Sequence, residues 1–379
     1  MSYLDNAATT KLDDVVRDTI IETLDIYYAN PSALYSDGFR SHKLLEDARK
    51  VIAKRLGCDT AEVFFTGSGT ESNNIAITGG ARARKNFGDE IVLTGYEHPS
   101  VYETVESLKK EGFHITTVNP SSNGTVSCDE IINAVTKNTA LVTVMHVNNE
   151  IGSIIDVVGL AKRVKEINPR TAFHCDMIQS FMKYPVTLAN SRIDTASVSA
   201  HKIHGPKGVG AVYIRKGFHI ETIIHGGNQE GGIRSGTENV IYANAFAVAA
   251  DRYKTEETTA HVKKLNLYLR EKLSCIDGVT INSTADASAY ILNFSIPGYR
   301  SENILHLLDS KGIMVSSGAA CSKGSISHTL KAMGLPKSIL ESSIRVSFSK
   351  DNCKEDIDRL IESLSVVKDN LLSTKPRNN

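Results

Sequence analysis

The sequence has 379 residues with 43 basic and 43 acidic side chains, so no net charge favours binding to nucleic acid or to an acidic membrane surface. A single hydrophobic core seldom grows beyond about 250–300 residues, so the length indicates two domains. Apolar residues make up 41% and charged residues 23% of the chain, which is usual for a soluble globular protein.

The first residues contain no basic segment followed by an apolar one, and no apolar run approaches the roughly 18 residues needed to span a bilayer. We therefore expect a cytoplasmic protein without membrane attachment or direct nucleic acid binding. The six cysteines form no C-x-x-C pair, and their spacing predicts neither a zinc site nor a disulfide framework.

Short apolar runs alternate with helical patterns through the first two-thirds of the chain. The predicted strands are 62–66, 90–94, 140–146, 171–175, 195–199 and 210–214. The predicted helices between the earlier strands are 71–85, 100–111, 128–136 and 157–167. This alternation predicts an α/β fold with a mostly parallel sheet covered by helices on both faces.

The pattern changes near residue 240, where helices begin to dominate. The later predicted helices are 239–252, 258–273, 302–311 and 354–372, and the later predicted strands are 279–281, 289–295 and 344–349. We expect a large α/β domain over residues 15–250 and a smaller α+β domain formed by residues 1–14 and 251–379.

In open α/β sheets, ligands bind beyond the carboxyl ends of the strands. After the first predicted strand, Gly69 and Thr70 stand at the start of a helix, where backbone N–H groups and a hydroxyl can bind a phosphate. A plain glycine-rich turn with a threonine cap is the alternative. After the second strand, His98 can stack on a flat ring and exchange protons near neutral pH, or simply begin a helix.

Two further strand ends carry charged side chains. Asp176 can hold a protonated ring nitrogen, although capping a helix is the simpler role for an aspartate in this position. Lys202 lies in a tight, glycine-containing segment, and lysine is the side chain that forms a Schiff base with an aldehyde. Phosphate cradle, carboxylate and lysine together match the phosphate, ring nitrogen and aldehyde of pyridoxal 5'-phosphate (PLP).

Three candidates lie elsewhere. Asn149 follows the third strand and offers hydrogen bonds. Arg345 could clamp a carboxylate with two hydrogen bonds, although a lone arginine in a strand is more often structural. Cys321 lies in a run of Gly, Ala and Ser that predicts an exposed loop, and the positive charge of the nearby Lys323 would favour its reactive thiolate form. The alternative is a buried structural cysteine.

The motifs resemble, in the same order, those of cysteine desulfurases of the NifS/IscS type, which are class V aminotransferases with the PLP-dependent transferase fold type I. The segments that carry the resemblance are 3–10, 67–74, 97–100, 146–152, 199–210, 226–239 and the loop of Cys321. It implies a homodimer that takes sulfur from L-cysteine, releases L-alanine and holds the sulfur as a persulfide on Cys321. Acceptor proteins in iron–sulfur cluster assembly, or in tRNA or cofactor thiolation, would then receive it.

The resemblance also implies a role for each candidate. Lys202 forms the Schiff base with PLP and moves the substrate's α-proton, Asp176 pairs with the ring nitrogen, and His98 stacks on the ring as acid and base. Gln179 and Asn149 bind the side of the ring hydroxyl, Asn149 also lying near the substrate. The phosphate ligands are Gly69, Thr70, Ser199, His201 and, from the second subunit, Thr237. Arg345 binds the carboxylate of the substrate, and Cys321 attacks the sulfur of the substrate. Cys321 is also a candidate transient ligand of an iron–sulfur cluster, and no firm metal site is expected.

Two features depart from the family pattern. Gly231 stands where the family usually has an arginine, and the stretch after Cys321 is shorter than usual. We expect both to affect acceptor choice and turnover rather than the core reaction. The alternatives are a selenocysteine lyase or another class V PLP enzyme, and a PLP-binding scaffold without activity.

Overall fold

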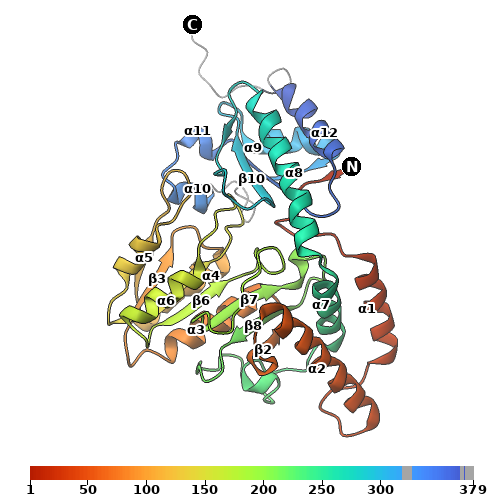
Figure 1. The fold of residues 1–379 in the computed structure, drawn as a ribbon, viewed down its shortest axis with the longest axis vertical. Coiled ribbons are helices and arrows are strands. Elements are labelled where there is room, and N and C mark those ends of the chain that lie inside the picture. Colours follow the sequence, from red (N-terminus) through yellow and green to blue (C-terminus); the bar gives the residue numbers. More distant parts are fainter. Residues whose placement is uncertain (318–326, 368–370, 372–379) are drawn as a thin grey trace.

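The computed structural model describes residues 1–317, 327–367 and 371. A large sheet with its helices fills the lower part of the molecule in Figure 1, and a smaller sheet with its helices lies above it. The long helix α8 (Thr255–Ser274) leads from the lower part into the upper part. The N-terminus lies at the upper part, beside α12 (Lys354–Ser365).

The described residues form seven strands in the large sheet, in the order β2-β8-β7-β6-β5-β3-β4. Their bounds are β2 Val63–Thr66, β3 Glu90–Thr94, β4 His114–Val118, β5 Thr139–Met145, β6 Ala172–Asp176, β7 Thr195–Ser199 and β8 Gly210–Ile214. Only β8 runs opposite to the others in this sheet. The carboxyl ends of the other six strands therefore lie at one edge, as expected for a mostly parallel sheet.

Each face of the large sheet is covered by helices. Residues alternate between the faces along a strand, as Ile91 and Val92 of β3 do by packing in different hydrophobic clusters. The helices over one face are α3 (Gly69–Arg82) and α4 (Pro99–Leu108). Those over the other are α1 (Asp14–Ile26), α2 (Ser36–Leu56), α5 (Cys128–Ala134), α6 (Val157–Ile167) and α7 (Val240–Arg252). The sheet is thus buried on both sides.

The second sheet is antiparallel, in the order β12-β13-β10-β9. Its strands are β9 Thr280–Ile281, β10 Ile291–Ser295, β12 Ser316–Ser317 and β13 Ser343–Ser347, with a separate parallel pair formed by β1 Ser2–Tyr3 and β11 Ile313–Met314. A third core joins this sheet to α8, α9 (Ser301–Ser310) and α12, and it includes Leu4 from the N-terminal segment. The division of the chain into domains at residues 14 and 250 stays a prediction.

The remaining elements are short. They are α10 His328–Ala332, α11 Lys337–Leu340 and the 3-10 turns η1 Thr60–Glu62, η2 Lys109–Glu111, η3 Ala200–Lys202 and η4 Glu230–Gly232. No helix within the described ranges is long and apolar enough to cross a membrane.

The α/β fold with a mostly parallel sheet is confirmed. The longest elements that were not predicted are α1, α2 and β4, and the short elements β1, β11, β12, α10 and α11 were not predicted either. β4 is an edge strand with several exposed residues, so it lacks the apolar run that marks the buried strands. The final helix α12 ends at Ser365, before the predicted residue 372.

A buried ion pair ties α2 to the large sheet. The guanidinium of Arg49 contacts both carboxylate oxygens of Glu230, at 2.5 and 2.9 Å. The same carboxylate accepts a hydrogen bond from the backbone N–H of Phe65, and Arg49 donates to the carbonyl of Val63. Because both charged groups are buried and hydrogen-bonded to each other and to the backbone of β2, the pair fixes η4 against β2.

Glu230→Gln should lower the free energy of unfolding by about 3 kcal/mol, because it leaves the buried Arg49 charge uncompensated. Denaturant unfolding of the purified protein measures this. Asp47→Asn, which removes one partner of the exposed pair between Lys50 and Asp47, is the control and should cost less than about 1 kcal/mol. Equal effects of the two substitutions would contradict the importance of the buried pair.

Candidate active site

The predicted site segments gather at the shared edge of the large sheet. Residues 67–70 follow β2, residues 97–98 follow β3, residues 148–150 follow β5, residues 176–179 lie at the end of β6, and residues 199–202 follow β7. Because these strands are parallel to one another, their ends converge. Side-chain hydrogen bonds connect several of these segments, as Asn73 of α3 does by bonding to both Asp176 and Ser100.

The amine of Lys202 is held between two backbone carbonyls. Its Nζ donates to the oxygens of Ala7 and Ala8, at 2.6 and 2.7 Å. The pKa of Lys202 is lowered to about 7, mainly by burial and next by the neighbouring positive charge of Arg345. The carboxylate of Asp176 acts in the opposite direction. A large fraction of this amine is therefore uncharged and nucleophilic at neutral pH.

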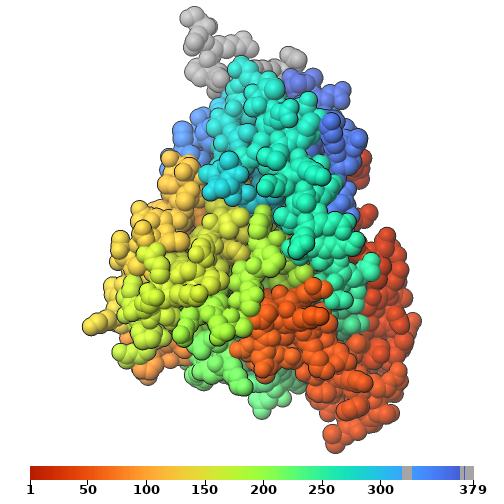
Figure 2. Space-filling view, viewed as in Figure 1, coloured from red at the N-terminus to blue at the C-terminus, as the bar shows by residue number. Residues whose placement is uncertain are grey.

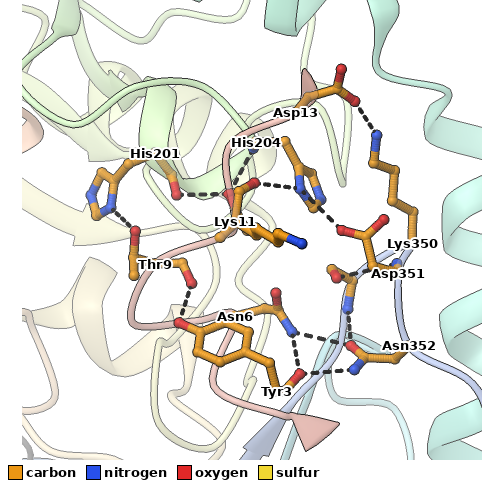
Figure 3. A network of polar contacts seen from close by, with 12 residues as sticks. Tyr3, Asn6, Thr9, Lys11, Asp13, His201, His204, Lys350, Asp351 and Asn352 are labelled. Atoms are coloured by element: carbon orange, nitrogen blue, oxygen red, sulfur yellow. Dashed lines mark hydrogen bonds and ion pairs between the residues drawn. The ribbon is translucent and has the colours of Figure 1, made fainter. Parts of the chain in front are cut away.

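The N-terminal segment contacts His201 and His204, the two histidines that flank Lys202 in the sequence, as Figure 3 shows for both histidines. The backbone N–H and hydroxyl of Thr10 both donate to the carbonyl of His201, at 2.9 Å each. The His201 ring also bonds to the hydroxyl of Thr9, at 3.2 Å, and the His204 ring bonds to the carbonyl of Lys11, at 2.9 Å. Both imidazoles are thereby fixed on either side of Lys202.

The same N-terminal segment is bonded to the chain that follows β13. The amide of Asn6 donates to the carbonyl of Ser347 at 2.9 Å and to the side chain of Asn352 at 3.1 Å. Asp13 pairs with Lys350. The N-terminal segment therefore connects the turn of Lys202 to the smaller sheet.

The carboxylate of Asp176 begins a chain of hydrogen bonds that ends at His98. Asn73 of α3 donates to Asp176 Oδ2 and to Ser100 Oγ, at 2.9 Å each. Ser100 in turn contacts His98 Nδ1, through its hydroxyl at 2.8 Å and through its N–H at 3.1 Å. Nδ1 is therefore an acceptor, which leaves the ring proton on Nε2. Burial lowers the pKa of His98, although the charge of Asp176 opposes this.

A second buried carboxyl lies close to Asp176. Glu97 accepts hydrogen bonds from the Thr94 hydroxyl and, at 2.9 Å, from the Met145 N–H. The pKa of Glu97 is raised to about 8, mainly by burial and to a smaller extent by the charge of Asp176. Glu97 is therefore mainly protonated at pH 7, so it places no second buried anion beside Asp176.

The start of α3 forms a cradle with Ser199. A Cβ added to Gly69 would lie 2.3 Å from Ile178 Cδ1 and 3.4 Å from Ser199 Cβ, so any larger residue there would force the Ile178 side chain to move. The hydroxyl oxygen of Ser68 caps α3 by accepting a hydrogen bond from the N–H of Glu71. The N–H groups of the residues before Glu71 are not bound by this hydroxyl and can bind a ligand. The buried hydroxyl of Ser199 has no partner in the described part of the chain. These are donors placed for an anion at a helix N-terminus.

Three predicted ligands occupy the rest of the site. Gln179 donates to the carbonyl of Ala7 at 2.8 Å, while its buried Oε1 has no partner among the described residues. Arg345, buried in β13, donates to Asp5 Oδ1 at 2.7 Å and to the carbonyl of Asn149 at 2.9 Å. Its Nε is also without a partner in residues 1–317, 327–367 and 371.

Two predicted residues are not brought into this cluster. Thr237 is exposed on the segment after β8, and Thr70 is exposed at the first turn of α3. Cys321 lies outside the described residues. The segments that flank it are anchored: Ser317 belongs to β12, and Ser327 donates to the carboxylate of Glu150 at 2.5 Å.

Some site residues were missed by sequence reasoning. Asn73 lies on the buried face of α3 in line with Gly69, Ala76 and Ile77, and a polar residue on an otherwise apolar helix face was a usable signal. The carbonyls of Ala7 and Ala8 gave no such signal, because every residue has a carbonyl.

Comparison with known proteins places this geometry in a family. Residues 2–360 match the family Aminotransferase class-V. A cysteine desulfurase of Nostoc sp. is 38% identical, with 100% of this chain and 95% of that protein covered. Cysteine desulfurase IscS of Dictyoglomus turgidum is 37% identical, with 99% and 96% covered. A solved structure titled NIFS-LIKE PROTEIN superposes with a TM-score of 0.92 at 36% identity, covering 98% of this chain and 100% of that one. The chain belongs to the class V aminotransferases and, within them, to the cysteine desulfurases of the NifS/IscS type.

Proposed function

We propose that this protein takes sulfur from L-cysteine, releases L-alanine and carries the sulfur as a persulfide on Cys321 until an acceptor protein receives it. The observation that carries the proposal is the half-buried amine of Lys202, whose pKa is lowered to about 7, in one cluster with the buried carboxylate of Asp176. The sequence identity to cysteine desulfurases over the full chain supports the same reaction.

The unpartnered oxygens of the site fit PLP. Ser199 Oγ and Gln179 Oε1 are buried polar atoms that lack partners in the described part of the chain, and burying such atoms is costly unless a ligand satisfies them. In this proposal Lys202 binds the aldehyde, Asp176 the ring nitrogen and Gln179 the ring hydroxyl. The phosphate ligands are Gly69, Thr70, Ser199, His201 and Thr237 of the second subunit. When bound, PLP withdraws electrons from the substrate's α-carbon.

The protein's own groups position the substrate and move its protons. Arg345 would bind the α-carboxylate of cysteine, with its guanidinium oriented by Asp5 and by the Asn149 carbonyl. Asn149 would add a hydrogen bond from its partly buried side chain. Lys202, as an uncharged amine, accepts the α-proton, and His98 Nε2 exchanges protons on the ring face. The hydrogen-bonded chain from Asp176 to His98 keeps the imidazole oriented.

Cys321 would supply the nucleophile. Its thiolate forms a bond to the substrate sulfur while the bond between that sulfur and the β-carbon breaks. The electron pair stays on the carbon fragment, which takes up protons and leaves as alanine. An acceptor thiol then removes the outer sulfur by exchange.

The proposal includes a homodimer, because large apolar side chains are exposed together on residues 28–39. Leu34 is fully exposed and Phe39 is 66% exposed in the single chain. The connection between α1 and α2 projects at the lower end of the molecule, at the red end of the colour scale, where Figure 2 shows it on the surface. Such patches on soluble proteins mark protein–protein contacts.

Cys321→Ala should abolish alanine formation from cysteine while leaving the absorbance of bound PLP intact, because only the sulfur acceptor is removed. Alanine is quantified after incubation with cysteine and a reductant. Cys275→Ala is the matched control, since Cys275 is an exposed cysteine that belongs to no site segment. Unchanged alanine formation by the Cys321 variant would reject the persulfide and favour another class V reaction.

The rate at which PLP forms its Schiff base with the cofactor-free protein should rise about tenfold between pH 6 and pH 8. The pKa of Lys202 is about 7, so the uncharged fraction of the amine increases from about one-tenth to about nine-tenths over that range. Stopped-flow absorbance gives the rate, and Lys202→Ala should show no band. A midpoint near that of an ordinary lysine, about 10.4, would refute a buried neutral amine.

Sedimentation should find a dimer for the wild-type protein and a monomer for Leu34→Glu combined with Phe39→Glu, because two charges in the patch must be desolvated on association. Phe87→Glu, at an exposed phenylalanine outside the patch, is the control and should stay dimeric. A monomeric wild-type protein would exclude Thr237 as a ligand from the second subunit.

A further inference from the structure

The carboxylate of Glu150, on the segment after β5, holds the first turn of α10. Its Oε2 accepts a hydrogen bond from the hydroxyl of Ser327 at 2.5 Å, and its Oε1 accepts one from the hydroxyl of Thr329 at 2.9 Å. Ser327 is also the N-cap of α10, where its hydroxyl oxygen accepts from the N–H of Leu330 at 3.0 Å. Both oxygens of this carboxylate are therefore bonded to the start of one short helix.

The backbone of Glu150 is itself fixed to the large sheet. The side-chain oxygen of Asn148 accepts from the N–H of Glu150 at 2.8 Å and from the N–H of Ile151 at 2.9 Å. The side-chain amide of Asn148 donates to the carbonyl of Tyr96 at 3.0 Å, on the segment that follows β3 and leads to His98. Glu150 therefore has a defined place at the edge of the sheet where the site residues gather.

The helix that Glu150 holds packs on the core of the large sheet. Leu330 of α10 and Met333 at its end are buried in the same hydrophobic cluster as residues of the strands. The ring of His328 contacts the ring of Tyr102 in α4, with centroids 4.6 Å apart. The strand before α10, β12, instead pairs with β13 of the smaller sheet. The chain between β12 and α10 thus starts at one sheet and ends at the other.

The residue before Glu150 contacts the proposed substrate-binding side. The carbonyl of Asn149 accepts a hydrogen bond from Arg345 at 2.9 Å. The carbonyl of Glu150 accepts one from Asn293 of β10 at 3.3 Å. Burial raises the pKa of Glu150, and the hydrogen bonds of its carboxylate oppose that rise. Two consecutive residues therefore bind the arginine proposed for the substrate carboxylate and the start of α10.

We infer that Glu150 is a positioning residue for the proposed reaction: by holding Ser327 and Thr329, it sets where the chain that carries Cys321 ends relative to the bound substrate. The inference rests on the proposed function, because only a thiol that must reach the substrate sulfur depends on this anchor. Cys321 lies outside the described residues and precedes Ser327 by six positions. Six residues span at most about 22 Å, so the place of Ser327 limits where that thiol can act.

A purely structural role explains the carboxylate less well. A serine hydroxyl alone is enough to cap a helix, as Ser127 does for α5, without a carboxylate bound to it among the described residues. Burying the carboxylate of Glu150 carries a desolvation cost that capping does not require. The additional bonds are explained if the location of α10 matters, and not only its formation.

Glu150→Ala removes both acceptors of the α10 hydroxyls and leaves Arg345 and the Asn149 side chain in place. In the PLP-loaded protein we expect the rate of the first turnover to alanine, at saturating cysteine, to fall at least about tenfold, because a misplacement of about 1 Å can slow a reaction a hundredfold. The cysteine concentration that half-saturates the change in PLP absorbance should stay within about twofold of the wild-type value. Rapid-quench analysis and absorbance titration measure the two quantities.

Amide hydrogen exchange of the full-length protein freed of PLP gives a readout that does not depend on activity. Peptides from residues 327–333 should exchange faster in Glu150→Ala and in Thr329→Val than in the wild type, because the first turn of α10 has lost its anchor. Since both substitutions remove the same contact, their combination should slow the first turnover no more than Glu150→Ala alone. Independent, additive effects on that rate would overturn the inference.

Glu341→Gln is the matched control, because Glu341 is a half-buried glutamate of the same part of the chain that pairs with Lys337 rather than with α10. Its first turnover and the exchange of residues 327–333 should equal those of the wild type. Should Glu150→Ala fail to fold, Glu150→Gln keeps the size of the side chain and removes one acceptor. A folded variant at position 150 with an unchanged first turnover, unchanged exchange, or a loss explained by weaker cysteine binding would overturn the inference.

The wild-type reaction separates the failure of this inference from that of the proposed function. A wild-type protein that forms no alanine would reject the desulfurase reaction and the role of Glu150 with it. Wild-type alanine formation together with an unaffected Glu150→Ala variant would reject only the role of Glu150.

Discussion

The buried amine of Lys202 is the constraint on which the arrangement of this site depends. A lysine can react with an aldehyde only when it has lost its proton, and water stabilises the protonated form strongly. The fold meets this requirement by surrounding the amine with protein and by placing the positive charges of Arg345 and Lys183 within its field. The carbonyls of Ala7 and Ala8 accept its two N–H bonds, so the uncharged amine is fully satisfied.

The N-terminal segment makes that burial possible and links it to the substrate side. The segment crosses from the core of the smaller sheet, where Leu4 is buried, to the turn of Lys202, where Thr10 bonds to His201. On the way Asp5 fixes Arg345. A movement of the smaller sheet would therefore be transmitted through one continuous stretch of chain to both the amine and the proposed carboxylate-binding arginine.

The sequence was enough to predict the large sheet's strands other than β4, together with the residues at their ends, because buried strands are apolar runs and the ends of parallel strands share one edge. Lys202, Asp176 and His98 were chosen as candidate site residues in this way. What it could not give were contacts made by backbone atoms, such as those of Ala7, or by a side chain whose role depends on its burial. Lys183, which is only 5% exposed, is an example, because nothing in its sequence neighbours predicts a buried lysine. The helices α1 and α2 bury residues on one side only, and this spacing of buried residues is a pattern from which both helices could have been predicted.

The reversed strand β8 explains why a phosphate cradle forms at this end of the sheet. β8 lies between β2 and β7, so its first residue, Gly210, pairs with Thr66 on one side and with Ser199 on the other. A Cβ at Gly210 would lie 2.8 Å from the backbone of Ser68, so the absence of a side chain lets the loop after β2 fold over the strand. Gly69 then reaches the side of Ser199. One antiparallel strand that begins with glycine thus brings together a helix N-terminus and an unpartnered hydroxyl from strands that are not neighbours in the sheet.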